Sequence, residues 1–193
     1  MNNAALQFLG NFLRHPRQVG AVLPSSQALA QAMVAGLNLG PEQSLVEFGP
    51  GTGAFTQAIL DHLPNPANYL GIELNAQFIA RLRQRFPAAS FAQGSAEDAL
   101  TLHQKHNLPT AKAVVCGLPF ASLPEAVQDG VTRSLDTLLE NGGEFRTFQY
   151  VHAYHFPTAK KFRQRMDTLF GPSHRSPAIK MNMPPAYVVS WKR

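Results

Sequence analysis

Two carboxylates and a cluster of glycines carry the clearest chemistry in this sequence. Glu47 precedes the run Gly49-Pro50-Gly51-Thr52-Gly53, and Glu73 ends a second apolar run 24 positions after Gly49. Glycines let the backbone turn sharply and approach a ligand, because no Cβ stands in the way. The helix that follows offers free N–H groups to a negatively charged group, and a carboxylate at the next strand tip can accept the hydroxyls of a ribose. The spacing therefore predicts a nucleoside-binding pocket.

Two nucleoside ligands fit this glycine turn. The segment from Gly49 to Ala54 satisfies the dinucleotide pattern G-x-G-x-x-G/A. With Glu47 included it reads E-x-G-x-G-x-G, which resembles motif I of class I S-adenosylmethionine methyltransferases. A carboxylate two residues before the turn is awkward beside a pyrophosphate, but it suits the ammonium of a methionine moiety. We therefore expect S-adenosyl-L-methionine, with a dinucleotide as the alternative.

Composition limits the class of protein. A chain of 193 residues suggests one domain, or one domain with a small extension. The single cysteine, Cys116, excludes an intramolecular disulfide and fits a reducing cytosol. We find no stretch of about 18 apolar residues that could span a membrane, no signal peptide, and no metal-ligand spacing among the seven histidines. We expect a cytoplasmic protein without a metal, either soluble or peripheral on the inner face of the membrane.

The net charge of +5 is unevenly distributed along the chain. Residues 41–100 carry six acids and three bases, whereas residues 146–193 carry nine bases and a single acid, Asp167. A basic end attracts an anionic surface, either nucleic acid or anionic lipid. A solvated helix face beside a basic tail explains the same pattern equally well.

Apolar periodicity and turn residues predict alternating strands and helices, followed by a hairpin. The expected strands are 44–49, 69–74, 90–94, 111–116, 144–151, 174–181 and 186–192. The expected helices are 27–37, 54–63, 76–86, 96–105, 124–139 and 157–170. Such alternation implies parallel strands with helices on both faces, and the hairpin adds one antiparallel strand. We predict a Rossmann-like α/β fold with a seven-stranded, mostly parallel sheet and an N-terminal helical extension.

In open sheets of this kind, ligands bind beyond the carboxyl ends of the strands. The first four strand tips carry Gly49–Gly53, Glu73–Asn75, Gly94–Ala96 and Cys116–Phe120. All four tips are therefore expected to open onto one crevice.

Short motifs over nearly the whole chain point to a narrower family. In the N-terminal half they are Phe12-Leu13-Arg14, Pro16, Val19-Gly20-Ala21-Val22-Leu23-Pro24-Ser25-Ser26, Glu47-Phe48-Gly49-Pro50-Gly51-Thr52-Gly53 and Gly71-Ile72-Glu73-Leu74-Asn75. They continue with Gly94-Ser95-Ala96, Cys116-Gly117-Leu118-Pro119-Phe120, Phe148-Gln149-Tyr150 and Asn182-Met183-Pro184-Pro185-Ala186. The chain thereby resembles bacterial phospholipid N-methyltransferases, small relatives of the rRNA adenine dimethyltransferases.

The resemblance implies a set of binding residues. Glu47 would bind the methionine end of the cofactor and Glu73 the ribose. Relatives commonly hold the adenine amine with an Asp where this chain has Ser95-Ala96, so Glu97 or Asp98 would substitute. We expect the cofactor to be bound by Glu47, Gly49, Pro50, Gly51, Thr52, Gly53, Glu73, Leu74, Ser95, Ala96 and Cys116. Cys116 is expected to act through packing and not as a nucleophile.

The tip of the fourth strand distinguishes between acceptors. Adenine dimethyltransferases carry an Asn there, and this chain has Gly117. A nucleobase amine is poorly nucleophilic and needs a side-chain acceptor, whereas an alkyl amine is strongly nucleophilic once its proton has left. Backbone carbonyls near Gly117 and Leu118 then suffice to orient the nitrogen. Tyr150, at the end of the fifth strand, either lines the acceptor pocket or is a core aromatic.

The N-terminal segment has an apolar helical face, formed by Ala5, Phe8, Leu9, Phe12 and Leu13. With Arg14, His15 and Arg17 nearby, such a helix can lie in a membrane interface, or it can pack over the cofactor as a lid. We divide the chain into an N-terminal extension, 1–40, and a methyltransferase domain, 41–193.

Together these features predict an S-adenosylmethionine-dependent N-methyltransferase that acts on phosphatidylethanolamine or its partly methylated forms. Its expected partners are the phospholipid substrate and, transiently, an anionic membrane surface. The alternatives are an rRNA adenine methyltransferase, a methyltransferase of a small soluble amine, and a non-catalytic module that binds membrane or RNA.

Overall fold

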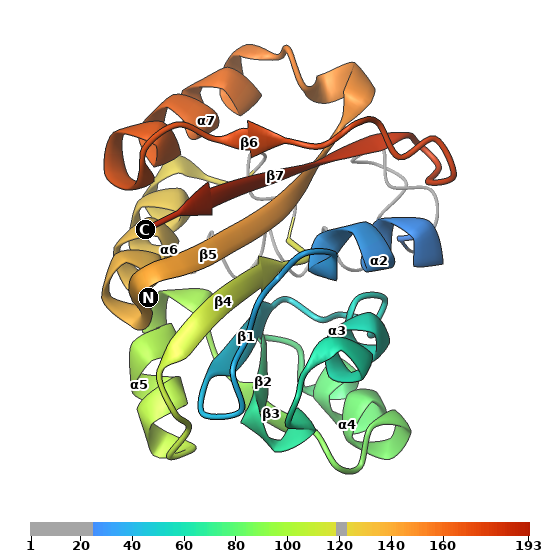
Figure 1. Ribbon diagram of the computed structural model, residues 1–193, viewed down its shortest axis with the longest axis vertical. Coiled ribbons are helices and arrows are strands. Elements are labelled where there is room, and N and C mark those ends of the chain that lie inside the picture. The colour runs from blue at the N-terminus through green and yellow to red at the C-terminus, as the bar shows by residue number, and fades with distance from the viewer. Residues whose placement is uncertain (1–24, 119–122) are drawn as a thin grey trace.

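The computed structural model describes residues 25–118 and 123–193, and a seven-stranded sheet forms its centre (Figure 1). In spatial order the strands are β3 (Ser90–Gln93), β2 (Tyr69–Glu73), β1 (Ser44–Phe48), β4 (Ala111–Cys116), β5 (Leu139–Tyr150), β7 (Ala186–Lys192) and β6 (His174–Arg175). The first five strands in this order, β3, β2, β1, β4 and β5, pair in parallel. β7 is antiparallel to both β5 and β6. The predicted Rossmann-like α/β fold, with one antiparallel strand, is confirmed.

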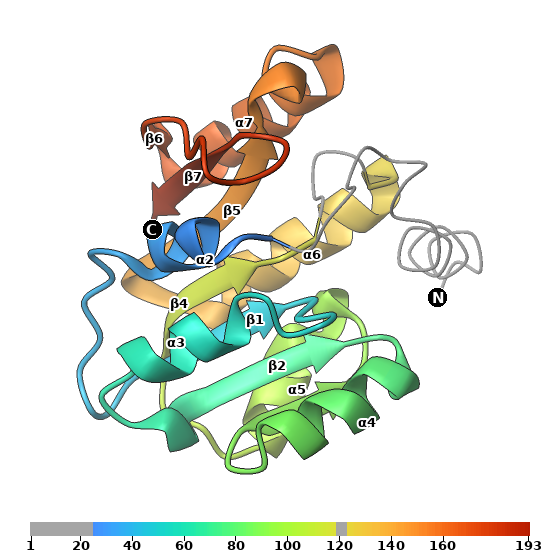
Figure 2. The ribbon, with the colours of Figure 1, turned by 90° about the vertical axis from the view of Figure 1, so that its right-hand side faces the viewer.

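Helices cover both faces of the sheet (Figure 2). One face carries α2 (Gln27–Val34), α3 (Thr56–His62) and α4 (Ala76–Arg85), and the other carries α5 (Ala99–Lys105), α6 (Glu125–Leu138) and α7 (Pro157–Phe170). Successive residues of a strand point to opposite faces. Leu45 of β1 therefore packs in the core under α2 to α4, and its neighbour Val46 packs in the core under α5 to α7. All five residues of β1 are buried, as expected for a central parallel strand.

Helix α2 packs on the same core as the strands, with Leu29 and Met33 fully buried. Its N-cap is Ser26, whose hydroxyl accepts a hydrogen bond from the Leu29 N–H at 3.2 Å. The apolar helical face between Ala5 and Leu13 lies outside the described residues. The division into an extension and a domain stays a prediction.

Strand β5 begins earlier than predicted. The expected strand 144–151 left Asn141-Gly142-Gly143 between it and the preceding helix, but α6 ends at Leu138 and β5 starts at Leu139. Gly142, with a φ of +75°, lies where the pairing of β4 with β5 becomes irregular. Its N–H donates to the carbonyl of Arg193 at 2.8 Å. The glycines therefore form the irregular segment near the start of β5 and do not cap the helix.

The first strand of the closing hairpin is shorter than the predicted 174–181, because β6 covers only His174–Arg175. Pro177 has no N–H to donate to the ladder. The neighbouring Ser176 hydroxyl accepts a hydrogen bond from the Val188 N–H at 2.9 Å. Pairing resumes only as a single bridge between Ile179 and Ala186.

The ends of several helices differ slightly from the predicted ends. Helix α3 begins at Thr56, two residues later than expected, because the preceding residues form turns. The predicted helix 96–105 is divided into a short 3-10 turn, Ala96–Asp98, and α5. Helix α2 ends at Val34, three residues before the predicted end.

Candidate cofactor-binding and active site

The glycine turn after β1 requires glycine for two separate reasons. Gly49, Gly51 and Gly53 have φ values of +66°, +55° and +80°, which side chains with a Cβ rarely adopt. A Cβ at Gly49 would also run into the Leu118 side chain, whereas at Gly51 the nearest atom would be 3.9 Å away. The Leu118 side chain therefore packs against the turn at Gly49, whereas the turn is open at Gly51. That open side is where a ligand can approach the backbone.

Glu73, at the tip of β2, holds this turn in place. Its Oε2 accepts a hydrogen bond from the Gly51 N–H at 3.0 Å, and its Oε1 accepts one from the Asn75 N–H at 2.9 Å. The residue is 2% exposed, and burial raises the pKa of the carboxyl although these hydrogen bonds lower it. A carboxylate has about four lone-pair sites, so both oxygens can still accept ribose hydroxyls.

Glu47 is completely buried, and only one of its two carboxylate oxygens is hydrogen-bonded within the described residues. Its Oε2 accepts hydrogen bonds from Thr56 Oγ1 at 2.8 Å and from the Tyr69 hydroxyl at 2.6 Å. Its Oε1 is buried and has no hydrogen-bond partner among the described residues. Burial is the main cause that raises the pKa of this carboxyl to about 7. An unpaired buried carboxylate oxygen is unfavourable, so a cationic ligand group or a proton is needed beside it.

These features fit S-adenosylmethionine. The orphan oxygen of Glu47 suits an ammonium group, and Glu73 suits a ribose. The open backbone at Gly51 leaves room for the ligand between them. Thr56 and Tyr69 are the hydrogen-bond donors to Glu47, and neither was predicted. Tyr69 lies 22 positions after Glu47, so their contact cannot be read from the sequence alone. The only available signal was that both residues are polar and lie within the predicted helix 54–63 and strand 69–74.

The tip of β4 lies directly against the glycine turn. The Gly117 N–H donates to the Phe48 carbonyl at 2.8 Å, and a Cβ at Gly117 would lie only 2.8 Å from the Gly49 carbonyl oxygen. This backbone has no room for a side chain at position 117. The Leu118 side chain is buried against Gly49. Pro119 and Phe120 of the same motif lie outside the described residues.

Cys116 is fully buried at the end of β4, and its Sγ lies 3.9 Å from the Leu118 carbonyl oxygen. Burial raises the pKa of the thiol to about 12, so the group is protonated at neutral pH. A protonated, buried thiol is a packing group and a poor nucleophile.

A row of rings connects the glycine turn to Tyr150. The centroid distances are 5.8 Å from Phe55 to Phe148, 5.4 Å from Phe148 to Tyr150 and 5.7 Å from Tyr150 to His152. Tyr150 is partly buried, and burial raises the pKa of its phenol, which therefore stays neutral. Phe55 belongs to the core under α2 to α4, and Phe148 and Tyr150 pack against that core near the carboxyl end of β5. Sequence reasoning found Tyr150 but missed Phe55 and the order of the rings.

Ser95 and Ala96 lie where the third strand tip was expected. The Ser95 hydroxyl accepts a hydrogen bond from the Glu97 N–H at 3.2 Å and so caps the short 3-10 turn. The Glu97 carboxylate packs against Gly130 of α6, where a Cβ would collide with it. Leu74, after β2, is partly buried against the core. The structure brings Gly49, Pro50, Gly51, Thr52, Gly53, Glu73 and Gly117 together and places Glu97 against α6.

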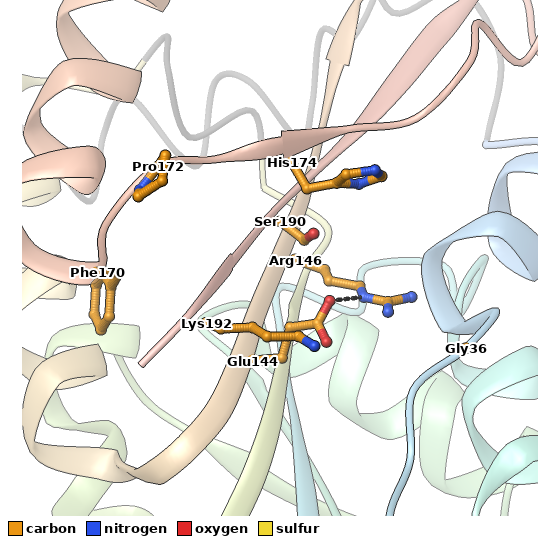
Figure 3. Close-up of a pocket in the computed structure, with 8 residues that line it drawn as sticks. All are labelled: Gly36, Glu144, Arg146, Phe170, Pro172, His174, Ser190 and Lys192. Carbon is orange, nitrogen blue, oxygen red and sulfur yellow. Dashed lines mark hydrogen bonds and ion pairs between the residues drawn. The ribbon is translucent and has the colours of Figure 1, made fainter.

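A second concavity, of about 470 Å³, lies at the other end of β5 (Figure 3). It is lined by Gly36, Glu144, Arg146, Phe170, Pro172, His174, Ser190 and Lys192. Arg146 donates to Glu144 at 2.6 Å and to the carbonyl oxygens of Met33 and Ala35 at 3.2 and 2.7 Å. Its charge is therefore balanced, and its role is to anchor the C-terminal end of α2 to β5.

The described residues contain neither a metal-ligand cluster nor a membrane-spanning helix. Within 25–118 and 123–193, no three potential ligands among His, Cys, Asp and Glu lie close enough to hold a metal ion. Over the same residues, no helix is long and apolar enough to span a membrane.

Comparisons of the sequence with known proteins agree with this geometry. A family model described as a methyltransferase domain matches residues 46–145. An ornithine lipid N-methyltransferase of Singulisphaera acidiphila is 28% identical over 174 residues, which cover 89% of this chain and 91% of that relative. A ribosomal RNA small subunit methyltransferase A of Burkholderia multivorans is 35% identical over 83 residues, which cover 42% of this chain and only 30% of that relative.

Solved structures share the architecture at low sequence identity. A glycopeptide N-methyltransferase complexed with S-adenosyl-L-homocysteine has a TM-score of 0.65 at 14% identity, over 85% of this chain and 86% of that chain. A methyltransferase from Anabaena variabilis has a TM-score of 0.64 at 14% identity, over 100% and 96% of the two chains. These similarities establish the fold. With the family match, they support S-adenosylmethionine as the cofactor. The matched region covers more than half of the sequence, and this chain accordingly belongs to the methyltransferase domain family, with a class I fold.

Proposed function

We propose that this methyltransferase acts on the aliphatic amine of a membrane lipid headgroup. Phosphatidylethanolamine and its partly methylated forms are the expected acceptors, and the amine of an ornithine lipid is a second source of the same chemistry. The similarity to an ornithine lipid N-methyltransferase over 91% of that relative supports a lipid acceptor. The rRNA relative matches over only 30% of its length.

The observation that carries the proposal is the lack of room at Gly117, where a Cβ would lie only 2.8 Å from the Gly49 carbonyl oxygen. A conjugated base amine needs a polarising side-chain acceptor, and this backbone excludes a side chain at position 117. An alkyl amine needs none once it is neutral. Its pKa in water lies between roughly 8 and 10 by analogy with α-amino and lysine groups, and an apolar cleft lowers that pKa. The glycine at this tip therefore favours an aliphatic amine.

When bound, S-adenosylmethionine supplies an electrophilic methyl group on a sulfonium sulfur. The chain contributes mainly alignment and the exclusion of water. Leu118 and the rings of Phe148 and Tyr150 provide apolar surface near the tips of β4 and β5. The Tyr150 hydroxyl is neutral and can accept a hydrogen bond from the amine. Transfer would break the S–CH3 bond of the sulfonium and form one N–C bond. S-adenosylhomocysteine would leave as the neutral thioether, and the methylated amine would release one proton to water.

Transfer of a radiolabelled methyl group to a panel of acceptors tests the proposal. The panel contains vesicles with phosphatidylethanolamine, vesicles with ornithine lipid, ethanolamine in solution and rRNA. Label in either lipid, absent with the Glu73→Gln variant, is the expected result. Label in rRNA alone, or in free ethanolamine alone, would contradict the proposed acceptor. The two lipid arms distinguish the two headgroups.

A further inference from the structure

The loop 176–185 between β6 and β7, here called the methionine loop, exposes two large apolar side chains. Met181 is 83% exposed and Met183 is 65% exposed. In the described part of the chain, only two other large hydrophobic residues, Phe156 and Leu169, are exposed to a comparable degree. Two such side chains in one loop form a local apolar surface, which water solvates poorly.

The methionine loop is held in a defined conformation. Asn182, between the two methionines, is 2% exposed. Its Nδ2 donates to the Pro184 carbonyl at 2.7 Å, and its Oδ1 accepts a hydrogen bond from the Ser26 N–H at 2.9 Å. Because the central residue is anchored inward, the methionines on both sides are presented outward on a backbone with little freedom left to lose on binding.

The methionine loop lies beyond the carboxyl end of β5. Tyr150, the last residue of β5, pairs with Ala186, and the Val151 N–H donates to the Pro185 carbonyl at 2.9 Å. β5 runs parallel to β4, and β4 runs parallel to β1. The loop is therefore at the same edge of the sheet as the glycine turn and Gly117. Figure 1 shows the loop between β6 and β7 on the side toward which β4 and β5 run. Phe156, 54% exposed, lies in the turn that follows β5 at this edge.

The charge around the methionine loop is positive and uncompensated. The sequence contains no acid after Asp167, whereas Arg175 and Lys180 lie beside or within the loop. Neither cation forms an ion pair with any residue that the structure describes. The Arg175 guanidinium stacks over the Tyr187 and Tyr154 rings, with its Cζ 4.6 and 5.1 Å from the two centroids.

Exposed apolar side chains flanked by unpaired cations match the chemistry of an anionic lipid surface. We propose that the methionine loop docks the protein on an anionic bilayer, with Met181 and Met183 at the acyl boundary and Arg175 and Lys180 at the headgroup phosphates. Docking there turns the carboxyl edge of the sheet, with the glycine turn, toward the membrane. The inference deepens the proposed function and rests on it, since a lipid-borne amine must be reached at a membrane surface.

Vesicle co-sedimentation of the full chain tests this surface. The vesicles contain phosphatidylcholine with about a third phosphatidylglycerol, and neutral phosphatidylcholine vesicles serve as the reference. The test variants are Met181→Gln/Met183→Gln and Lys180→Glu, because glutamine keeps the length of methionine while removing its apolar character. Leu169→Gln is the matched control, since Leu169 is also exposed (48%) but lies in the last turn of α7. Binding of S-adenosylhomocysteine and the thermal midpoint verify that each variant is folded.

The expected result is binding at least about ten-fold weaker for the double methionine variant. Lys180→Glu is expected to weaken binding at about 0.05 M salt but not at about 0.5 M. Leu169→Gln should bind within about two-fold of the wild type. Equal binding by the wild type and the double variant would overturn the inference, as would retention of the wild type by RNA but not by vesicles.

Methyl transfer to lipid in detergent micelles separates the two proposals. A wild-type protein that binds vesicles through the loop but methylates no lipid amine would refute the proposed function and leave the docking surface standing. A protein that methylates lipid in micelles, but whose double methionine variant binds vesicles normally, would refute the docking surface alone.

Discussion

Replacement of Glu47 by glutamine should make the cofactor-free protein more stable at high pH. Burial raises the pKa of the Glu47 carboxyl from 4.5 to about 7, so the folded state holds a proton that the unfolded state loses at lower pH. The protonated Glu47 carboxyl therefore contributes fully to the stability of the folded state below pH 4.5, and this contribution is lost as the pH rises through about 7. A difference of about 2.5 pKa units amounts to about 3 kcal/mol.

The variant removes this pH dependence because glutamine is neutral at every pH. Its amide oxygen can still accept from Thr56 and Tyr69, but its amide nitrogen has no acceptor at the position of Oε1, which costs about 1 kcal/mol at all pH values. Relative to the wild type, Glu47→Gln should therefore be slightly less stable near pH 4.5 and about 2 kcal/mol more stable at pH 8. Urea unfolding of both proteins across this range measures the difference. A difference that stays constant with pH would refute the reasoning.

The same carboxyl should couple cofactor binding to pH. If the ammonium of the ligand binds the ionised form of Glu47, the apparent dissociation constant scales with 1 + 10^(pKa − pH). Affinity for S-adenosylhomocysteine should then rise about eight-fold between pH 6 and pH 7.5, with proton release visible as a buffer-dependent heat. Glu47→Gln should bind about 100-fold more weakly and without this pH dependence.

Substitutions at three residues test the strand tips. Gly117→Ala should cost about 1–3 kcal/mol of stability and slow methyl transfer, because the new Cβ would press on the Gly49 carbonyl; Gly40→Ala, where the nearest atom would be 3.7 Å away, should change the unfolding midpoint little. Cys116→Ala should lose about 1 kcal/mol of stability and keep a methyl-transfer rate within about two-fold of the wild type, whereas loss of activity would reveal a chemical role for the thiol. Tyr150→Phe should keep the ring row and most of the activity, whereas Tyr150→Ala should raise KM for the lipid about ten-fold; equal kinetics for both variants would remove Tyr150 from the acceptor pocket.

The architecture was predictable because the central strands are short apolar runs with clear ends. Gly49 follows β1, Gly117 follows β4, and Glu73 ends β2. Glu47 and Glu73 end or nearly end such runs, and the parallel arrangement places the strand tips at one edge. The sequence misled where a residue type has two uses. Gly142 and Gly143 look like a helix cap but form an opening of β5, and Pro177 interrupts a strand that hydrophobic alternation alone would continue.

The interior of the site was less predictable, since it depends on pairs that are distant in sequence. The hydrogen bonds of Glu47 come from the start of α3 and from the first residue of β2, and only the register Leu45 to Tyr69 brings the latter close. The row from Phe55 through Phe148 to Tyr150 likewise requires the sheet order. The family motif implied a binding role for Glu47, but not that one of its oxygens is buried without a hydrogen-bond partner among the described residues.

Calorimetric titration with S-adenosylhomocysteine tests the central claim most directly, because the account depends on two carboxylates that bind opposite ends of one nucleoside. Wild-type protein should bind one ligand per chain, and the folded Glu47→Gln and Glu73→Gln variants should each bind at least about ten-fold more weakly. The absence of binding by the wild type, or affinities unchanged in both variants, would contradict the account.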